Sequence, residues 1–164
     1  MGLRPTDPLN IDDLAAHMDV KVVSAQRLIP LERLEELERL QAFSFSAATF
    51  EVRGRTYVVT NPLRSAGRLA SDVAHELSHL DLGHDLSEVR EVDGVPFRTC
   101  RPDEEEQATS LGGTLLLPRP LLVQAAVRGM SPEDIAKQYV VTIDMARFRY
   151  NSTGVAKQIA RRSG

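Results

Sequence analysis

Residues 75–79 read His75-Glu76-Leu77-Ser78-His79, and this stretch decides how the surrounding chain is interpreted. In a helix, side chains four residues apart lie about one turn apart on the same face. The imidazoles of His75 and His79 can therefore bind one metal ion, and Glu76 can reach a water molecule at that ion. This order of residues is typical of zinc peptidases, in which the glutamate takes a proton from the attacking water.

The flanking sequence predicts that the motif lies on an amphipathic helix. Ser65 is a candidate N-cap, and no proline interrupts the stretch that follows it. Gly83 is a plausible C-terminal stop. Apolar residues recur at three- and four-residue steps and give one apolar face: Leu69, Val73, Leu77 and Leu80.

Two strands are predicted upstream of this helix. Residues 43–52 and 55–60 flank a turn at residues 53–54, and Asn61-Pro62 ends the second strand. The edge of such a sheet could hold an extended substrate. That role is a hypothesis, because a sequence does not show which edge is open.

Three further elements are predicted nearer the N-terminus. Asn10 can cap a short helix that runs to Met18, and a short strand follows at residues 20–23. Leucines at three-residue steps, with Glu/Arg pairs between them, predict a helix over residues 31–40. We expect this helix to pack on the sheet.

A zinc site of this type needs a third protein ligand and leaves a fourth position for water. His84 would give three histidines, but it follows His79 by five residues, whereas the known three-histidine spacing requires six. Asp81 and Asp85 are too close in sequence to fold back easily. The acidic run at residues 103–106 opens another helix, where carboxylates are also common for dipole reasons alone. One of its glutamates is the best of these alternatives.

Three stretches resemble the ImmA/IrrE family of metallopeptidases. Residues 74–84 are similar to the family's Ala-His-Glu-x-x-His core, which is followed shortly by Leu-Gly-His. Residues 105–118 are similar to its second motif, a glutamate with Asn or Asp four residues on, then small residues and a Leu-Leu-Met-Pro ending. Residues 145–154 resemble a C-terminal helix of many members. The resemblance covers nearly the whole chain.

The resemblance implies a zinc-dependent endopeptidase with one Zn²⁺ per chain. His75, His79 and Glu105 would be the metal ligands, and Glu76 the catalytic base. Glu105 takes this place by counting back from the end of the second motif. The resemblance also implies a substrate, a helix-turn-helix transcriptional repressor whose cleavage relieves repression, often encoded beside the peptidase in phages or mobile elements.

The chain departs from the family pattern at several positions. Thr109 replaces the usual Asn or Asp, a position that orients a ligand by hydrogen bonding, and a threonine hydroxyl reaches less far. Gln107 replaces a common glutamate. Gly112 and Gly113 replace alanines, and each helix-interior glycine costs about 1 kcal/mol relative to alanine. Close packing against the histidine-bearing helix would compensate for this cost.

The C-terminal third offers candidates for two further roles. Arg147 and Tyr150, with Arg149 and Asn151 beside them, could stabilise an oxyanion, although packing and surface charge explain them equally well. Residues 132–150 also resemble a helix-turn-helix whose arginines could enter a major groove. The turn lacks glycine, so we expect a structural role and no direct DNA binding. A non-hydrolytic antirepressor or a DNA-binding regulator remains the alternative function.

Composition limits the class of protein. A chain of 164 residues suits one compact domain, and a net charge of −3 gives no general nucleic-acid footprint. The lone Cys100 cannot form an internal disulfide. No apolar run reaches membrane-spanning length, and residues 1–10 have no secretion signal. We therefore expect a cytoplasmic protein with no membrane partner.

Together these features predict an α+β fold. We expect a small, mainly antiparallel sheet packed on the zinc-binding helix and a glutamate-bearing helix, with a helical, helix-turn-helix-like C-terminal section. Residues 1–9 should form a loose segment, residues 10–128 a zincin-like metallopeptidase domain, and residues 129–164 a helical extension packed on that domain.

Overall fold

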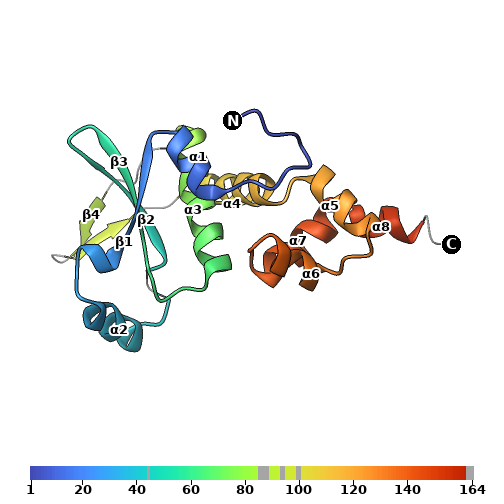
Figure 1. The fold of residues 1–164 in the computed structure, drawn as a ribbon. Helices are drawn as coiled ribbons and strands as arrows, with labels where there is room; N and C mark the ends of the chain where they lie inside the picture. Colours follow the sequence, from blue (N-terminus) through green and yellow to red (C-terminus); the bar gives the residue numbers. More distant parts are fainter. Residues whose placement is uncertain (44, 85–88, 93–94, 99–100, 162–164) are drawn as a thin grey trace.

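The computed structural model describes residues 1–43, 45–84, 89–92, 95–98 and 101–161, so Asp85 and Cys100 lie outside the described residues. Helices and strands are interspersed up to residue 98, and every element after residue 101 is a helix (Figure 1). In chain order they are α1 (Ile11–His17), β1 (Val20–Ser24), the 3-10 helix η1 (Ala25–Arg27), α2 (Leu31–Leu40), β2 (Ala47–Val52), β3 (Arg55–Thr60), α3 (Ala66–Asp81), β4 (Val89–Val92), β5 (Val95–Arg98), α4 (Pro102–Leu116), α5 (Arg119–Val127), α6 (Pro132–Gln138), α7 (Ile143–Ser152) and α8 (Val155–Ala160).

The main sheet has three strands in the order β1-β3-β2. Strand β2 pairs antiparallel with β3, whereas β1 pairs parallel with β3. The prediction of a mainly antiparallel sheet is therefore wrong, because the sheet is mixed. The reason is topological: β1 and β2 run in opposite directions, and β3 inserts between them, so a strand antiparallel to β2 is necessarily parallel to β1.

A second, smaller sheet lies in the segment between α3 and α4. Strands β4 and β5 pair antiparallel in it, with Val89 opposite Arg98. The mixed charge, glycine and prolines of this segment conceal two strands of only four residues each.

Helices cover both faces of the main sheet. Val58 of β3 packs with Val73 and Leu77 of α3 and with α1 on one face. Its neighbour Val59 points the other way and packs with Leu34 of α2. This alternation follows from the two-residue period of a strand, and it places α3 and α2 on opposite faces.

The C-terminal helices form a separate core next to α3. Helix α4 runs from the sheet region to this group of helices (Figure 1). Its last turn packs with α5, α6, α7 and α8, and Ala74 of α3 belongs to the same core. Helix α6 begins with a capping box between Ser131 and Asp134. The helix-turn-helix character of this section and the boundary at residue 128 stay predictions.

Local sequence signals correctly predicted where several helices and strands begin or end. The side chain of Ser65 caps α3 by accepting a hydrogen bond from the Arg68 amide, and Gly83 follows the helix with φ +66°. Arg53 and Gly54 both have positive φ, as a tight two-residue hairpin turn requires. None of the described helices has the length and apolar character needed to cross a membrane.

Candidate metal centre

The candidate site lies on one face of α3. His75 and His79 are four residues apart and share a face of the helix, and Glu76, three residues before His79, lies about 100° round the helix from His75. Glu76 and His79 are 4% and 5% exposed, whereas His75 is half-buried. The two imidazoles and the carboxylate are thus held in a largely dry environment.

Helix α4 brings Glu105 to the two histidines. The Nε2 atom of His75 lies 3.1 Å from Oε2 of Glu105, and Nε2 of His79 lies 3.4 Å from Oε1 of Glu105. The two Nε2 atoms are 3.0 Å apart. Among the described residues these three form the only group of His, Cys, Asp and Glu side chains placed to hold a metal ion.

The donor set and its spacing fit a tetrahedral zinc ion. Zinc in proteins takes imidazole nitrogens and carboxylate oxygens at about 2.0–2.2 Å, so two ligand atoms of one ion lie roughly 3.3 Å apart. The three separations between His75, His79 and Glu105 are 3.0, 3.1 and 3.4 Å. The two imidazole nitrogens and the Glu105 carboxylate therefore converge at a spacing compatible with ligation of one metal ion.

The opposite ring nitrogen of each histidine has its own partner. Nδ1 of His79 lies 3.0 Å from Nδ1 of His84, and Nε2 of His84 lies 3.2 Å from Oε1 of Gln107. One tautomer satisfies both contacts: His79 donates from Nδ1 to His84, and His84 donates from Nε2 to Gln107. This tautomer leaves the Nε2 lone pair of His79 directed at the cluster.

A similar arrangement holds His75. The hydroxyl oxygen of Thr109 lies 3.4 Å from Nδ1 of His75. Donation from Nδ1 to this oxygen would keep the Nε2 lone pair of His75 available to a metal. Thr109 therefore lies where the sequence placed a ligand-orienting group, and its contact is long, as the short threonine side chain suggests.

A residue of the sheet forms a hydrogen bond with Glu76. Thr49 of β2 donates a hydrogen bond from its hydroxyl to Oε2 of Glu76 at 2.5 Å. The bond joins residues 27 positions apart in the sequence. Strand alternation turns Thr49 toward α3, while its neighbour Phe50 faces the other side of the sheet.

A glycine allows α3 and α4 to approach closely at the cluster. A Cβ atom on Gly112 would lie 3.2 Å from the carbonyl carbon and oxygen of Ala74 and from the nitrogen of His75. These are backbone atoms, so they have little freedom to move aside. The expected compensation for a helix-interior glycine is present at Gly112, and it acts directly beside a candidate ligand.

A cleft of about 340 Å³ opens beside the cluster, between α3, α4 and Met145 of α7. His75 and Glu105 form part of its wall. Asp72 also lines it, about one helical turn before His75, and forms an ion pair with Arg68. Burial raises the pKa of the Asp72 carboxyl, and Arg68 opposes this shift.

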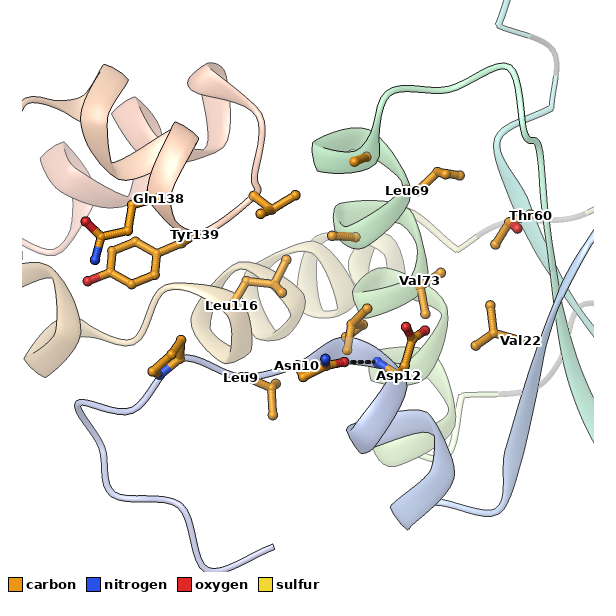
Figure 2. Close-up of a pocket in the computed structure, with 15 residues that line it drawn as sticks. Leu9, Asn10, Asp12, Val22, Thr60, Leu69, Val73, Leu116, Gln138 and Tyr139 are labelled. Atoms are coloured by element: carbon orange, nitrogen blue, oxygen red, sulfur yellow. Dashed lines mark hydrogen bonds between the residues drawn. The ribbon is translucent and has the colours of Figure 1, made fainter.

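A second cavity, of about 520 Å³, is separate from the cluster (Figure 2). Figure 2 shows Leu69 and Val73 of α3 on one side of it, and Tyr139 lies toward the C-terminal helices. The N-terminal segment near Leu9 lines another side. No candidate ligand borders this cavity, which lies on a different face of α3 from His75.

A comparison with protein-family models matches residues 28–151 to Peptidase_M78, the IrrE N-terminal-like domain. The chain belongs to this family. The match includes His75, His79 and Glu105. It also includes Gln107 and Thr109, the two α4 residues that contact His84 and His75. Comparisons with curated proteins and with solved structures found no match.

Membership of the Peptidase_M78 family confirms the resemblance to ImmA/IrrE peptidases and supports a metallopeptidase-type hydrolase function. The cluster of His75, His79 and Glu105 is compatible with the metal ion that such an enzyme requires. In this family member the buried carboxylate of Glu76 lies on α3 between the two histidines of the cluster.

The oxyanion candidates make their described contacts away from the cluster. Arg147 forms an ion pair with Glu133, with 2.6 Å between Nη2 and Oε1. Tyr150 packs against the C-terminal core. Arg149 is buried and donates to the backbone oxygen of Leu117, and burial lowers the pKa of its guanidinium. The described contacts bring none of the three to the cluster.

Among the described residues, the other candidates for the third ligand lie outside the cluster. His84 contacts the far side of the His79 ring, so it is neither a member of the cluster nor simply a solvent-facing residue. Asp81 is exposed at the end of α3, and Glu104 forms an ion pair with Arg101. Glu106 is exposed and lies outside the cluster.

Sequence reasoning missed Thr49 and the supporting role of His84. Thr49 could have been found from the alternation of β2, which turns every second residue toward α3. His84 was tested only as a metal ligand, although a ligating histidine also needs a partner for its other nitrogen.

Proposed function

We propose that the protein is a zinc-dependent endopeptidase that cleaves a helix-turn-helix transcriptional repressor and thereby relieves repression. One observation carries the catalytic part of this proposal. The Nε2 atoms of His75 and His79 and the two carboxylate oxygens of Glu105 converge with separations of 3.0–3.4 Å, while a hydrogen bond from Thr49 holds the buried carboxylate of Glu76 on the helix that carries both histidines.

His75, His79 and Glu105 would hold the zinc ion. A bound zinc ion would polarise the scissile carbonyl and lower the pKa of a water molecule. Hydrogen bonds from Nδ1 of His79 to His84 and from Nδ1 of His75 to Thr109 would hold both imidazoles in the tautomer that a metal requires, with the Nε2 lone pairs directed inward.

Glu76 would act as the general base and then the general acid. Its carboxylate takes a proton from the attacking water as the water oxygen bonds to the carbonyl carbon. The same proton passes to the amine nitrogen as the C–N bond breaks. The hydrogen bond from Thr49 to Oε2 fixes the orientation of the carboxylate during both transfers.

The sheet provides a place for an extended substrate. Among the described strands, β2 pairs only with β3, so its other edge carries backbone groups that a peptide could pair with. Thr49 of this edge strand contacts Glu76, and a peptide along β2 would therefore pass beside the base. The cleft next to His75 could accept one substrate side chain.

The contacts of two arginines favour the peptidase over a DNA-binding regulator. A helix-turn-helix reader needs side chains that can reach base edges. Arg149 is buried against Leu117, and Arg147 is paired with Glu133. A repressor as substrate is the partner that the family resemblance suggests, and it needs no DNA contact by this chain.

Metal content gives the first test. We would measure zinc by elemental analysis for the wild type and for Glu105→Ala, with Glu104→Ala and Glu106→Ala as neighbouring controls. We expect one zinc per chain, lost selectively in Glu105→Ala because only Glu105 contacts both histidines. A wild-type protein that binds no zinc at neutral pH would overturn the zinc site.

Cleavage gives the second test. A repressor encoded beside the gene would be incubated with the zinc-loaded protein, and the products would be sequenced by mass spectrometry. Glu76→Gln should retain zinc and abolish cleavage, because an amide cannot accept the proton. Full relief of repression by Glu76→Gln would instead support the non-hydrolytic antirepressor.

A further inference from the structure

The face of the main sheet opposite α3 carries an apolar groove of about 500 Å³. Its floor includes Tyr57 and Val59 of β3. Leu37 of α2 forms part of its wall, and Phe50 and Val52 of β2 line it near the hairpin turn, which Figure 1 shows on the side away from α2. The groove is separate from the metal centre, which is on the α3 side of the sheet.

Helix α2 covers only part of this face. Leu34 is buried against Val59, but Leu37 remains 40% exposed. The hairpin of β2 and β3 extends away from α2 (Figure 1), and Phe50 and Val52 are about half exposed. Single exposed apolar residues are common, whereas a contiguous apolar surface of this kind marks an interaction site.

The hairpin end of the groove is positively charged. Lys21 and Arg55 each lie two residues before a groove-lining residue and therefore face the same side of the sheet. Arg53 lies in the hairpin turn. All three are exposed, and none forms an ion pair within the part of the chain that the structure describes.

The α2 end has the opposite charge. This helix carries four glutamates against two arginines. Glu32, Glu36 and Leu40 follow one another at four-residue steps and form one row on its surface. Leu40 is 81% exposed. Glu36 pairs with Arg33, which precedes Leu37 by four residues, and Glu38 pairs with Arg64, so the helix presents exposed leucines with a small net negative charge, which complements the apolar, basic hairpin.

We propose that this face is the interface of a homodimer. The α2 helix of one copy lies on the hairpin end of the other copy's groove, with Leu37 and Leu40 against Phe50 and Val52. A two-fold axis makes the same contact twice, because an isologous interface uses one surface patch on both subunits.

A second copy is the occupant that the charges favour. The acidic helix and the basic hairpin belong to one surface but lie at opposite ends of the groove, so they do not neutralise each other within one chain. A two-fold axis brings each end to its complement in the partner. The interface leaves the α3 side of the sheet open, so both copies keep an accessible metal centre.

The oligomeric state tests the proposal directly. We would measure molar mass by sedimentation over a range of protein concentrations for the wild type and Phe50→Glu. Phe148→Glu is the matched control, because Phe148 is 60% exposed on α7 and does not line the groove. We expect a dimer for the wild type and the control, and a monomer for Phe50→Glu. A monomeric wild type, or a dimeric Phe50→Glu, would overturn the proposal.

Charge reversal tests the arrangement without relying on the fold of one variant. Arg53→Glu/Arg55→Glu and Glu32→Lys/Glu36→Lys should each weaken the dimer by more than about tenfold, because like charges then meet twice. An equimolar mixture should form a heterodimer, in which both contacts pair opposite charges again. If the mixture dissociates as readily as either variant alone, α2 does not lie on the hairpin of the partner.

Discussion

Thr49 donates a 2.5 Å hydrogen bond to Glu76 and so ties the edge strand β2 to the carboxylate of α3. The donor and the acceptor come from different layers of the fold, and Glu76 is 4% exposed. A peptide that paired with β2 would therefore bind to the same strand that orients the proposed base. Substrate alignment and base orientation would then have a common structural origin.

Removing the Thr49 hydroxyl should slow catalysis without releasing the metal. Thr49→Val keeps the side-chain volume but loses the donor, so we expect kcat to fall roughly tenfold to a hundredfold, as for other partners of functional groups. Thr49→Ser keeps the hydroxyl and should retain most of the activity. Steady-state kinetics on the repressor and zinc analysis would separate the two effects. Loss of zinc in Thr49→Val would contradict a role confined to Glu76.

Gly112→Ala should weaken zinc binding and stability together. The added methyl group would meet backbone atoms of Ala74 and His75 at 3.2 Å, which forces α3 and α4 apart near the ligands. Overpacking of this kind typically costs about 1–3 kcal/mol. We would measure the free energy of unfolding by denaturant titration and zinc affinity by competition with a chelator.

Gly113→Ala is the matched control for that change. Both substitutions gain about 1 kcal/mol of helix propensity. A Cβ atom on Gly113 would meet Cδ of the Arg149 side chain at 3.2 Å, and a side chain can move more readily than a helix backbone. We expect a smaller loss of stability and unchanged zinc affinity. Equal effects of the two variants would mean that the close contact between α3 and α4 at Gly112 does not determine stability or zinc affinity.

His84→Ala should lower zinc affinity although His84 is not in the ligand cluster. Without His84, Nδ1 of His79 loses its partner at 3.0 Å, and the tautomer with an inward Nε2 lone pair is no longer favoured. Loss of such a partner typically costs about tenfold to a hundredfold in metal affinity. His17→Ala is the control, since His17 is exposed at the end of α1. Equal zinc affinities for these two variants would refute the supporting role.

The sequence specified local structure better than contacts between distant segments. Residues 31–40 and 55–60 were predicted with the observed bounds, because leucine spacing and turn residues act over a few positions. The central position of β3 was not predicted, since it depends on how three strands assemble. Val58 and Val59 carried a signal for it, because adjacent apolar residues in a strand indicate burial on both faces.

In the candidate site, too, the sequence predicted local geometry better than contacts between distant segments. Helical spacing placed His75 and His79 together, and the motif resemblance selected Glu105 among three adjacent glutamates. The bond from Thr49 joins different layers, so strand alternation could place Thr49 on the α3 side of β2 but could not identify Glu76 as its partner. The contact of His84 depends on the turn that follows α3, where Gly83 has φ +66° and redirects the chain.

The ion pair between Glu38 and Arg64 should make stability depend on pH. Arg64 donates to both carboxylate oxygens of Glu38 at 2.8–2.9 Å, and its side chain is 6% exposed. Arg64 holds the pKa of the Glu38 carboxyl below its usual range, with help from the amide of Phe43. The folded state therefore binds a proton less readily than the unfolded state. The contribution to stability is complete above about pH 4.3, the ordinary glutamate pKa, and is lost as the pH falls through the lower folded-state pKa.

Glu38→Gln should accordingly be less stable than the wild type at pH 7, because the guanidinium of Arg64 loses its counter-charge in a mostly buried position. The difference should shrink as the pH falls below about 4, where the wild-type carboxyl also becomes neutral. Denaturant titrations at several pH values would measure it. Glu35→Gln provides the control, since Glu35 is exposed on the same helix and should change stability little at any pH. A constant difference between wild type and Glu38→Gln from pH 7 to pH 3 would show that packing, and not charge, accounts for the role of Glu38.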